Sequence, residues 1–200
     1  MDEQSKLPFV NSARISPPPI IMERNGNQVS LDRLDNQDKL AWCKYGEKRE
    51  NEFVERFGSI LHLCLNPAKQ LDETEGKYAP DLFNYREQRP ADLKTITTPF
   101  YTANNYGMNP QTTITLNRKD VARYERLYSR ILIYFWVNYE RSEQFGQVVD
   151  ELHGIWIASF EKVMRLILVA PIHRYHQRTG LDGNAKDSYL LDLRSLTPCI

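Results

Sequence analysis

The chain has 200 residues, which is enough to bury one sizeable hydrophobic core but hardly two, so we expect one folded domain. Hydrophobic residues make up 41% of the chain and charged residues 26%, as in ordinary globular proteins, which excludes the disordered and fibrous classes. Lys plus Arg and Asp plus Glu number 26 each, so no overall positive field favours a general coat for nucleic acids.

The cysteines and the apolar runs indicate where the protein works. Cys43, Cys64 and Cys199 form no close pair, so their spacing predicts neither a disulfide framework nor a zinc knuckle and favours a reducing cytoplasm. The N-terminus has no basic segment followed by an apolar run, and the longest apolar stretches, residues 131–137 and 166–172, are too short to span a bilayer. We therefore expect a cytoplasmic protein, bacterial or from a phage in its host's cytoplasm, with no membrane partner.

The first part of the chain divides into an arm and a helix. Residues 1–35 are polar, contain three consecutive prolines and show no sustained periodicity, which predicts an N-terminal extension or arm, with the folded domain in residues 36–200. Within residues 37–63 apolar side chains recur at about 100° per residue, which predicts a long amphipathic helix with a weak point at Gly46.

The remaining segments predict an α/β domain. A polar link at residues 66–77 precedes a strand pair, and residues 99–117 are too polar for a core and predict a long loop or an irregular hairpin. The continuous apolar run of residues 131–137 is typical of a strand that is buried on both faces at the centre of a sheet. The other predicted elements are strands at 78–83, 91–97, 154–158 and 188–193 and helices at 120–130 and 160–168. This order implies helices around a central mixed β-sheet.

An acidic pattern falls on the predicted strand pair. The stretch PDLFNYREQRPADLK places ten residues between Asp81 and Asp92 and puts Lys94 two positions beyond the second acid. Adjacent strands lie roughly 4.8 Å apart, so acids on facing positions can share one hard cation, which prefers oxygen ligands. Residues two apart on a strand point to the same face, so Asp92 and Lys94 address the same metal ion and water molecule. The spacing predicts the metal site of a nuclease.

A surface hairpin is the alternative explanation, with Asp92 and Lys94 as an ordinary solvated pair worth about 0–1 kcal/mol. Glu50 counts against this alternative, because it falls on the apolar helix face that Phe53 and Phe57 define. A carboxylate in the middle of a core-facing stripe is costly unless it meets a cation or a hydrogen-bond donor.

These segments, in this order, resemble a known family. GEKRENEFVERF, PDLF and ADLK, followed by ILIYFWV and GIWIASFEKVMRLI, are similar to the PD-(D/E)XK nuclease superfamily over about residues 40–168. In that family a Glu from the first helix, one turn after a Gly, joins the two strand acids, and Gly46 with Glu50 fits this place. Glu47 and Glu52 are nearby rivals, although Glu52 falls on the polar face of the helix, where it is expected to be solvated.

The resemblance implies a fold and a chemistry. The fold is the restriction endonuclease-like three-layer core, an α/β arrangement in which helices flank a central mixed sheet. The chemistry is hydrolysis of DNA phosphodiester bonds by an endonuclease of restriction, phage or junction-resolving kind, with Mg²⁺ as cofactor and Mn²⁺ as a substitute. The resemblance implies that the ion is held by Asp81, Asp92 and the Leu93 backbone carbonyl. It also implies that Glu50 joins these ligands and that Lys94 orients the attacking water and helps to deprotonate it. Asp92 stands where many members have Glu, which the family pattern allows.

Basic and amide side chains supply candidate contacts to nucleic acid. Residues 117–130 and 161–186 are locally basic and suit phosphate groups, although charged helix faces are more often only solvated. The polar segment after the second strand carries Asn and Gln, which can read adenine edges in a groove, and a structural loop explains them equally well. The candidates are Asn105, Gln111, Arg118, Lys119, Arg123, Arg174, Arg178 and Lys186.

Two further functions stay open at this level. An RNA endonuclease would use the same site, and the sequence does not separate duplex DNA from RNA as the partner. A non-catalytic nucleic-acid-binding protein could retain the fold, but Asp81, Asp92 and Lys94 form a costly cluster that a protein without chemistry does not need. Cleavage of both strands of a duplex requires a homodimer or two successive nicks.

Overall fold

The computed structural model describes residues 21–22, 28–29, 39–70, 79–175 and 187–200. The chain forms two compact units, Met1–Asp35 and Asn36–Ile200. In the first unit the short strands β1 (Ile21–Met22) and β2 (Gln28–Val29) pair antiparallel, and the rest of the predicted arm lies outside the described residues.

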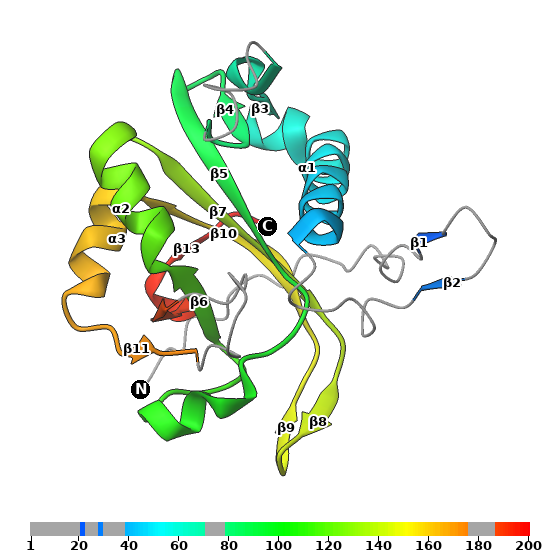
Figure 1. Ribbon diagram of the computed structural model, residues 1–200, viewed down its shortest axis with the longest axis vertical. Helices are drawn as coiled ribbons and strands as arrows, with labels where there is room; N and C mark the ends of the chain where they lie inside the picture. Colours follow the sequence, from blue (N-terminus) through cyan, green and yellow to red (C-terminus); the bar gives the residue numbers. More distant parts are fainter. Residues whose placement is uncertain (1–20, 23–27, 30–38, 71–78, 176–186) are drawn as a thin grey trace, which may run out of the picture. The chain divides into compact units, whose positions relative to one another are not determined.

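A six-stranded sheet forms the centre of the second unit (Figure 1). Its strands are β3 (Leu63–Leu65), β4 (Leu82–Asn84), β5 (Arg89–Ile96), β7 (Leu132–Tyr139), β10 (Leu152–Ser159) and β13 (Thr197–Pro198). They lie in the order β13, β10, β7, β5, β4, β3. β5 and β7 run parallel and the other neighbouring pairs run antiparallel, so the sheet is mixed. The helices around it are α1 (Lys39–Leu61), α2 (Arg118–Leu127) and α3 (Phe160–Ile167).

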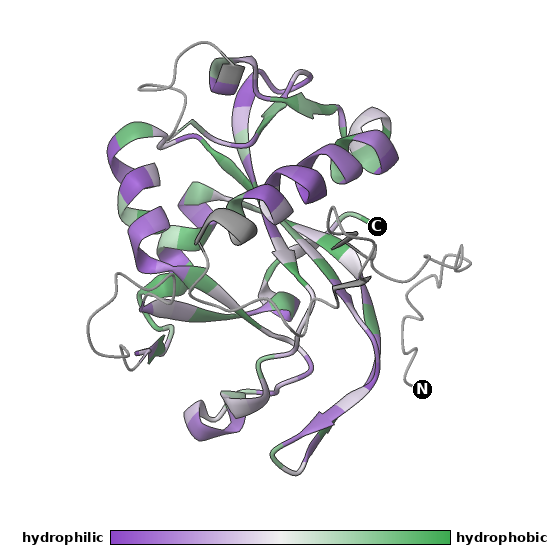
Figure 2. Ribbon diagram, turned by 45° about the vertical axis from the view of Figure 1, so that its right-hand side comes forward, coloured by the Kyte–Doolittle hydropathy of each residue, from purple (hydrophilic) through white to green (hydrophobic). Residues whose placement is uncertain are grey.

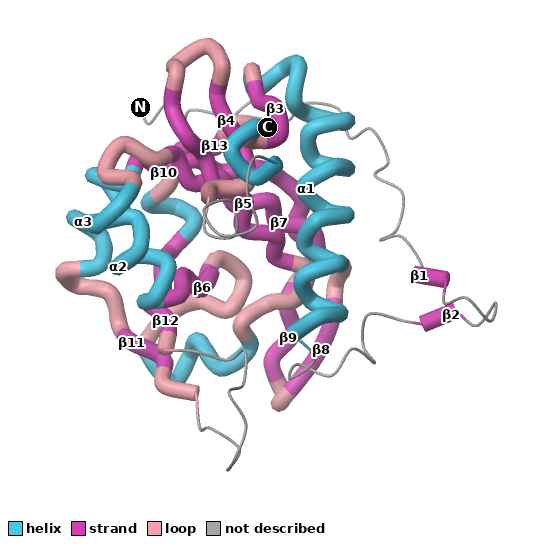
Figure 3. Tube along the Cα trace, turned by 45° about the horizontal axis from the view of Figure 1, so that its top comes forward, coloured by secondary structure: helices cyan, strands magenta, loops and turns pink. Residues whose placement is uncertain are grey.

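The packing of β7 explains how the sheet is covered. All eight residues of this strand are buried, and its seven apolar residues alternate between two hydrophobic clusters. Ile133 and Phe135 belong to the cluster that contains residues of α2 and α3, whereas Tyr134 and Trp136 pack with Phe53 of α1. Successive strand residues point to opposite faces, so α1 covers one face and α2 with α3 the other. In Figure 3 these helices lie on opposite sides of β5 and β7.

This arrangement confirms the predicted fold class, an α/β domain with three layers and a central mixed sheet. The apolar run of residues 131–137 is the central strand β7, as predicted, because a strand covered on both faces needs apolar side chains on both. α1 continues through Gly46 without the break that the sequence suggested, since an isolated glycine within a helix costs only about 1 kcal/mol. Figure 2 shows hydrophobic residues interspersed with hydrophilic ones along this helix.

A second sheet corrects the predicted loop or irregular hairpin after β5. The end of that polar segment forms β6 (Thr113–Asn117), which pairs antiparallel with β12 (Ser188–Asp192), and β12 pairs with β11 (Ile172–His173). Ile114 and Leu116 of β6 are buried in the main core. These two apolar residues alternate with Thr and Asn, so the segment is polar on average and its composition did not predict a strand.

Other differences concern strand ends. β4 begins at Leu82, and residues 71–78, which include part of the predicted link and the predicted start of this strand, lie outside the described residues. β8 (Ser142–Gln144) and β9 (Gln147–Val149) form a hairpin that the sequence did not indicate. The three cysteines are free. Among the described helices, none is long and apolar enough to cross a membrane.

Candidate active site

The hairpin of β4 and β5 brings the two predicted strand acids together. Leu82 pairs with Ala91, so one further step of this antiparallel ladder would place Asp81 opposite Asp92. The ladder stops there, because Asp81 precedes β4. Asp81 Oδ2 instead accepts a hydrogen bond of 3.2 Å from the Leu93 backbone N–H. The N–H and C=O of one strand residue point to the same side, so the Leu93 carbonyl also points toward the side of Asp81.

Asn66 holds Asp81 in this position. Its backbone N–H donates to the Asp81 carbonyl at 3.0 Å, and its side-chain amide donates to the Pro80 carbonyl at 2.9 Å. The side-chain oxygen of Asn66 accepts from the Ala68 N–H at 3.0 Å, within the turn that begins the 3₁₀ helix Pro67–Gln70. Because Asn66 is buried, these hydrogen bonds are shielded from water and fix the chain before β4.

Asp92 and Lys94 lie on the face of β5 that meets α2. Their neighbours Ala91 and Leu93 belong to the cluster beneath α1, and alternate strand residues point the other way. Asp92 is only 1% exposed. Its Oδ2 lies 2.8 Å from Lys94 Nζ, and its Oδ1 lies 3.5 Å from a terminal nitrogen of Arg123. The carboxylate is therefore buried between two cations.

α2 contributes side chains that the sequence did not assign to the catalytic cluster. Asp120 Oδ2 lies 2.6 Å from Lys94 Nζ, and Asp120 Oδ1 lies 3.4 Å from Arg123. Lys94 Nζ also lies 5.8 Å from the centroid of the Tyr124 ring. Asp120, Arg123 and Tyr124 share one helix face by their i, i+3, i+4 spacing, which is visible in the sequence. Nothing in the sequence shows that this face packs against β5.

Glu50 reaches the cluster through a lysine from the segment that the sequence presented as a polar link. Lys69 Nζ lies 2.8 Å from Glu50 Oε2 and 2.6 Å from Asp81 Oδ1. This ammonium joins α1 to the chain before β4. Lys69 carried no sequence signal, because a single lysine in a polar segment is usually a solvated side chain.

The two rival helix acids lie elsewhere. Glu47 is exposed. Glu52 Oε2 lies 2.7 Å from Arg49 and its Oε1 lies 3.2 Å from Arg56. Arg49 is buried, with its guanidinium carbon 3.7 Å from the centroid of a Trp136 ring. The sequence suggested that Glu52 is merely solvated. In the structure it pairs with Arg49, a buried arginine of the same helix that packs on Trp136.

The two strand acids have opposite pKa shifts. Burial, followed by the negative charges of Asp92 and Glu50, raises the pKa of Asp81 to about 7. Burial alone would also raise the pKa of Asp92, but the Lys94 ammonium and the adjoining side chains of α2 hold it below its ordinary value. Burial opposes the charge of Lys94, yet the adjacent carboxylates raise the pKa of this lysine well above its ordinary value, so it is an ammonium.

The cluster fits a divalent cation. Its four carboxylates exceed its three cations by one charge: Glu50, Asp81, Asp92 and Asp120 against Lys69, Lys94 and Arg123. Asp92 Oδ2 is buried without an aligned hydrogen bond, and the pKa of Asp81 is raised by burial first and then by the negative charges of Asp92 and Glu50. Mg²⁺ and Mn²⁺ bind carboxylate and carbonyl oxygens, and Asp81, Asp92 and the Leu93 carbonyl supply them.

The structure separates the predicted nucleic-acid contacts. Arg123 lies inside the acidic cluster, where it pairs with Asp92 and Asp120. Gln111 is tied to Asp150, because its amide nitrogen donates to the Asp150 carbonyl at 3.0 Å and its oxygen accepts from the Asp150 N–H at 2.8 Å. Both polar atoms of this side chain are therefore engaged within the protein. Of the others, Asn105 and Arg174 are exposed, and Arg178 and Lys186 lie outside the described residues.

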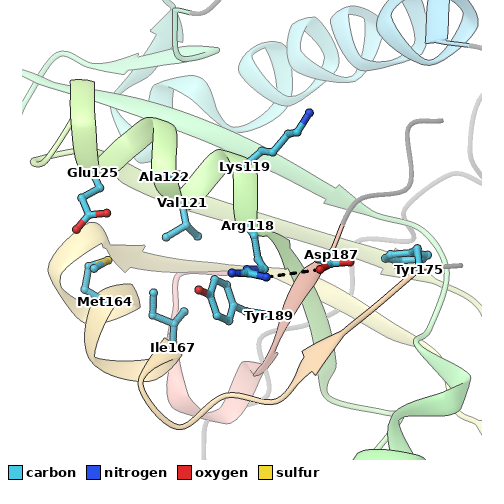
Figure 4. A pocket seen from close by; sticks show the side chains of 10 residues that line it. All are labelled: Arg118, Lys119, Val121, Ala122, Glu125, Met164, Ile167, Tyr175, Asp187 and Tyr189. Atoms are coloured by element: carbon cyan, nitrogen blue, oxygen red, sulfur yellow. Dashed lines mark ion pairs between the residues drawn. The ribbon is translucent and has the colours of Figure 1, made fainter. Parts of the chain in front are cut away.

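Arg118 and Lys119 border a cavity of about 530 Å³ that is lined mostly by residues of α2 and α3, with Tyr175, Asp187 and, from β12, Tyr189 (Figure 4). Arg118 points toward Tyr189 and pairs with Asp187 at 3.5 Å, whereas Lys119 extends away from them. At 100° per residue, Arg118, Ala122 and Glu125 lie on the face of α2 opposite to Asp120, and Lys119 and Val121 lie about 100° to either side of it. Most of the α2 side chains that line the cavity are thus turned away from the acidic cluster.

A second group of metal-ligating side chains lies near the C-terminal end of β7. Ligand atoms of Glu140, Glu151 and His153 lie within 4.8 Å of one another, and both glutamates are exposed. His153 Nδ1 lies 2.6 Å from Asn138 Oδ1. Exposed acidic groups commonly gather without a metal, so this group carries no assignment, and it is distinct from the cluster around Asp92.

Comparisons with known proteins add one structural likeness. No protein-family model and no curated protein sequence matches the chain. D212, a nuclease from a fusselovirus, has a solved structure to which this chain is similar over 81% of its own length and 84% of that chain, with a TM-score of 0.37 and 10% sequence identity. A likeness of this extent transfers no residue roles, so the functional assignment depends on the side chains described above.

Proposed function

We propose that the unit of residues 36–200 is a divalent-metal-dependent nuclease of the PD-(D/E)XK type that hydrolyses phosphodiester bonds in DNA. The observation that carries the proposal is the convergence of Asp81, Asp92 and Lys94 where β4 begins beside β5, with Glu50 on the adjoining helix. Two strand acids and a lysine on one strand, with a third acid from the first helix, are the set that the sequence resemblance requires.

The metal would be held by Asp81, Asp92 and the Leu93 carbonyl, with Mg²⁺ as the natural ion and Mn²⁺ as its substitute. When bound, the ion lowers the pKa of a water molecule and offsets the charge that develops on the phosphoryl oxygens. Different elements hold the two acids, since Asn66 binds the backbone of Asp81 and Arg123 of α2 pairs with Asp92. Glu50 adds a third carboxylate on the far side of Lys69.

Lys94 acts by its positive charge and its position. Its ammonium is held between Asp92 Oδ2 at 2.8 Å and Asp120 Oδ2 at 2.6 Å, so it has one defined place beside the strand acids. A fixed ammonium there orients an attacking water and favours its deprotonated form without competing for the metal. Asp120 is then a positioning residue, because it acts through Lys94.

The substrate proposal is duplex DNA. The chain has no net charge, so contacts to phosphate groups depend on local cations such as Lys119 at the start of α2, whereas Arg118 lies on the cavity side of this helix and pairs with Asp187. Asp120 in the same helix turn reaches Lys94, so the beginning of α2 lies beside the cluster. Cleavage of both strands would require a homodimer or two successive nicks. The proposed location of this nuclease is the cytoplasm.

A cleavage assay tests this function. The purified chain is incubated with supercoiled plasmid, single-stranded DNA and RNA in Mg²⁺, Mn²⁺ or EDTA, and we expect plasmid cleavage in either metal and none in EDTA. Lys94→Met should abolish cleavage, while the matched control Lys48→Met, at an exposed position of α1, should cut like the parent. Cleavage of RNA alone would transfer the proposal to an RNA endonuclease, and a parent that cuts no substrate in either metal would refute it.

A further inference from the structure

Lys69 lies where a positive charge matters most for the proposed site. Its ammonium is 2.6 Å from Asp81 Oδ1 and 2.8 Å from Glu50 Oε2. The side chains of Lys69, Asp81 and Glu50 are 29%, 19% and 14% exposed, so water screens these ion pairs only in part. The lysine is a partly buried cation shared by two carboxylates.

The backbone places Lys69 there. The Lys69 N–H donates to the Asn66 carbonyl at 3.1 Å, and the Asn66 N–H donates to the Asp81 carbonyl at 3.0 Å. The buried Asn66 therefore links the turn that carries the ammonium to the residue whose carboxylate the ammonium contacts. Such a link limits the positions that the long lysine side chain can take, and it distinguishes this pair from an ordinary surface salt bridge.

The ammonium and a divalent ion would compete for the same carboxylate. Asp81 offers Oδ1 to Lys69 at 2.6 Å and Oδ2 to the Leu93 N–H at 3.2 Å, so both oxygens have partners. A Mg²⁺ ion binds a carboxylate oxygen at about 2.0–2.1 Å, which would bring it close to the ammonium. Two cations at that separation repel each other in a partly buried site.

We propose, on the basis of the nuclease function above, that Lys69 is an internal counter-cation which competes with the divalent ion for Asp81 and so sets the metal affinity of the site. When the ion binds, Lys69 leaves Asp81 and keeps Glu50 as its partner. Glu50 then balances the charge of the ammonium that has left Asp81, because a cation in this partly buried place needs a carboxylate beside it. Before the ion binds, Lys69 prevents Asp81 and Glu50 from repelling each other.

Titration calorimetry with MnCl₂ on the full chain tests this role, together with the melting temperature in EDTA. Lys69→Met, which keeps the length of the side chain but removes its charge, should bind Mn²⁺ at least tenfold more tightly than the parent and should melt at a lower temperature in EDTA. Lys69→Arg keeps the charge and should bind Mn²⁺ within about threefold of the parent. Lys48→Met, an exposed lysine of α1, should match the parent in both measurements.

The outcomes separate this inference from the proposed function. If the parent binds Mn²⁺ and cleaves DNA but Lys69→Met binds Mn²⁺ equally well or more weakly, Lys69 is not a competing cation and only this inference is overturned. If the parent neither binds Mn²⁺ nor cleaves DNA, both fail. Should Lys69→Met not fold in EDTA, Lys69→Gln, which keeps an amide donor for the two carboxylates, must show the tighter binding.

Discussion

Asp81 and Asp92 are chemically identical side chains on one hairpin, and the fold gives them opposite electrostatic surroundings. Asp92 is buried between Lys94 and Arg123, and its pKa is lowered. Asp81 directly precedes β4, where its carboxylate lies 2.6 Å from the Lys69 ammonium. Burial and the charges of Asp92 and Glu50 raise its pKa to about 7.

The difference divides the site into a half that the protein balances by itself and a half that it leaves with excess negative charge. In the Asp92 half, Lys94 and Arg123 balance the buried carboxylate. Removal of any one of these three charges lowers the stability of the folded state, because it leaves a buried charge unpaired. The Asp81 half is the place where a cation from solution stabilises the fold most. The four predictions below test this contrast.

The largest expected effect comes from the acids themselves. Asp92→Asn and Asp81→Asn should each reduce cleavage by roughly 10³-fold or more, because both remove a carboxylate from the reacting centre. Their stabilities should differ. Asp92→Asn should lower the free energy of unfolding by roughly 3 kcal/mol in EDTA, since Lys94 and Arg123 lose a buried partner. Asp81→Asn should be at least as stable as the parent. Urea denaturation at pH 7.5 measures both, and equal losses would contradict the contrast.

Metal binding should stabilise the parent through Asp81. At about 100 times its Kd, Mn²⁺ adds about 2.7 kcal/mol to the stability of the folded state, which corresponds to a rise in Tm of roughly 5–10 °C for a chain of this size. Asp81→Asn should show a much smaller rise or none, because the amide has no negative charge and offers the ion only one neutral oxygen in place of a carboxylate. Scanning calorimetry with EDTA and with millimolar Mn²⁺ compares the two proteins. A parent whose Tm does not move would favour the surface-hairpin interpretation.

The pKa of Asp81 gives a smaller, pH-dependent effect. Because the folded state holds this proton up to about pH 7, whereas the unfolded chain loses it near pH 4, the contribution of Asp81 to stability falls as pH rises between these values. The pKa of Asp92 is lowered, so the stability that this carboxylate contributes to the folded state is present above about pH 4 and is lost as the pH falls below that value. In EDTA the Tm of Asp81→Asn minus that of the parent should therefore grow from pH 5 to pH 7.5 and then level off. A difference that is constant or shrinks over this range would show that the pKa of Asp81 is not raised.

The smallest effect is expected at Glu50, which meets the site through Lys69. Glu50→Gln should weaken Mn²⁺ binding by about tenfold or less, because Lys69 then has Asp81 as its remaining charged partner and is harder to displace. Glu47→Gln, at an exposed position one turn earlier on α1, should bind Mn²⁺ like the parent. Equal weakening in both variants would mean that the effect follows from the charge of the helix and not from the contact with Lys69.

Much of the architecture could be predicted from local patterns. The apolar run of β7 predicted a central strand, and the order of the segments predicted helices on both faces of a mixed sheet. β6 could not be predicted in this way, because its Ile114 and Leu116 alternate with polar residues and its partner β12 lies far along the chain. A strand of this kind is defined by its pairing, which local composition does not report.

For the site, the sequence by itself determined which residues share one strand face. The two-residue spacing of Asp92 and Lys94 puts both on the same side of β5, and the turn before it allows Asp81 to lie beside them. Only the tertiary structure decided the charges around these acids, because Lys69 and Asp120 reach them from separate elements. Burial together with the charges of Asp92 and Glu50 raises the pKa of Asp81, whereas Lys94 and the side chains of α2 lower that of Asp92, and these surroundings exist only once the elements have packed together.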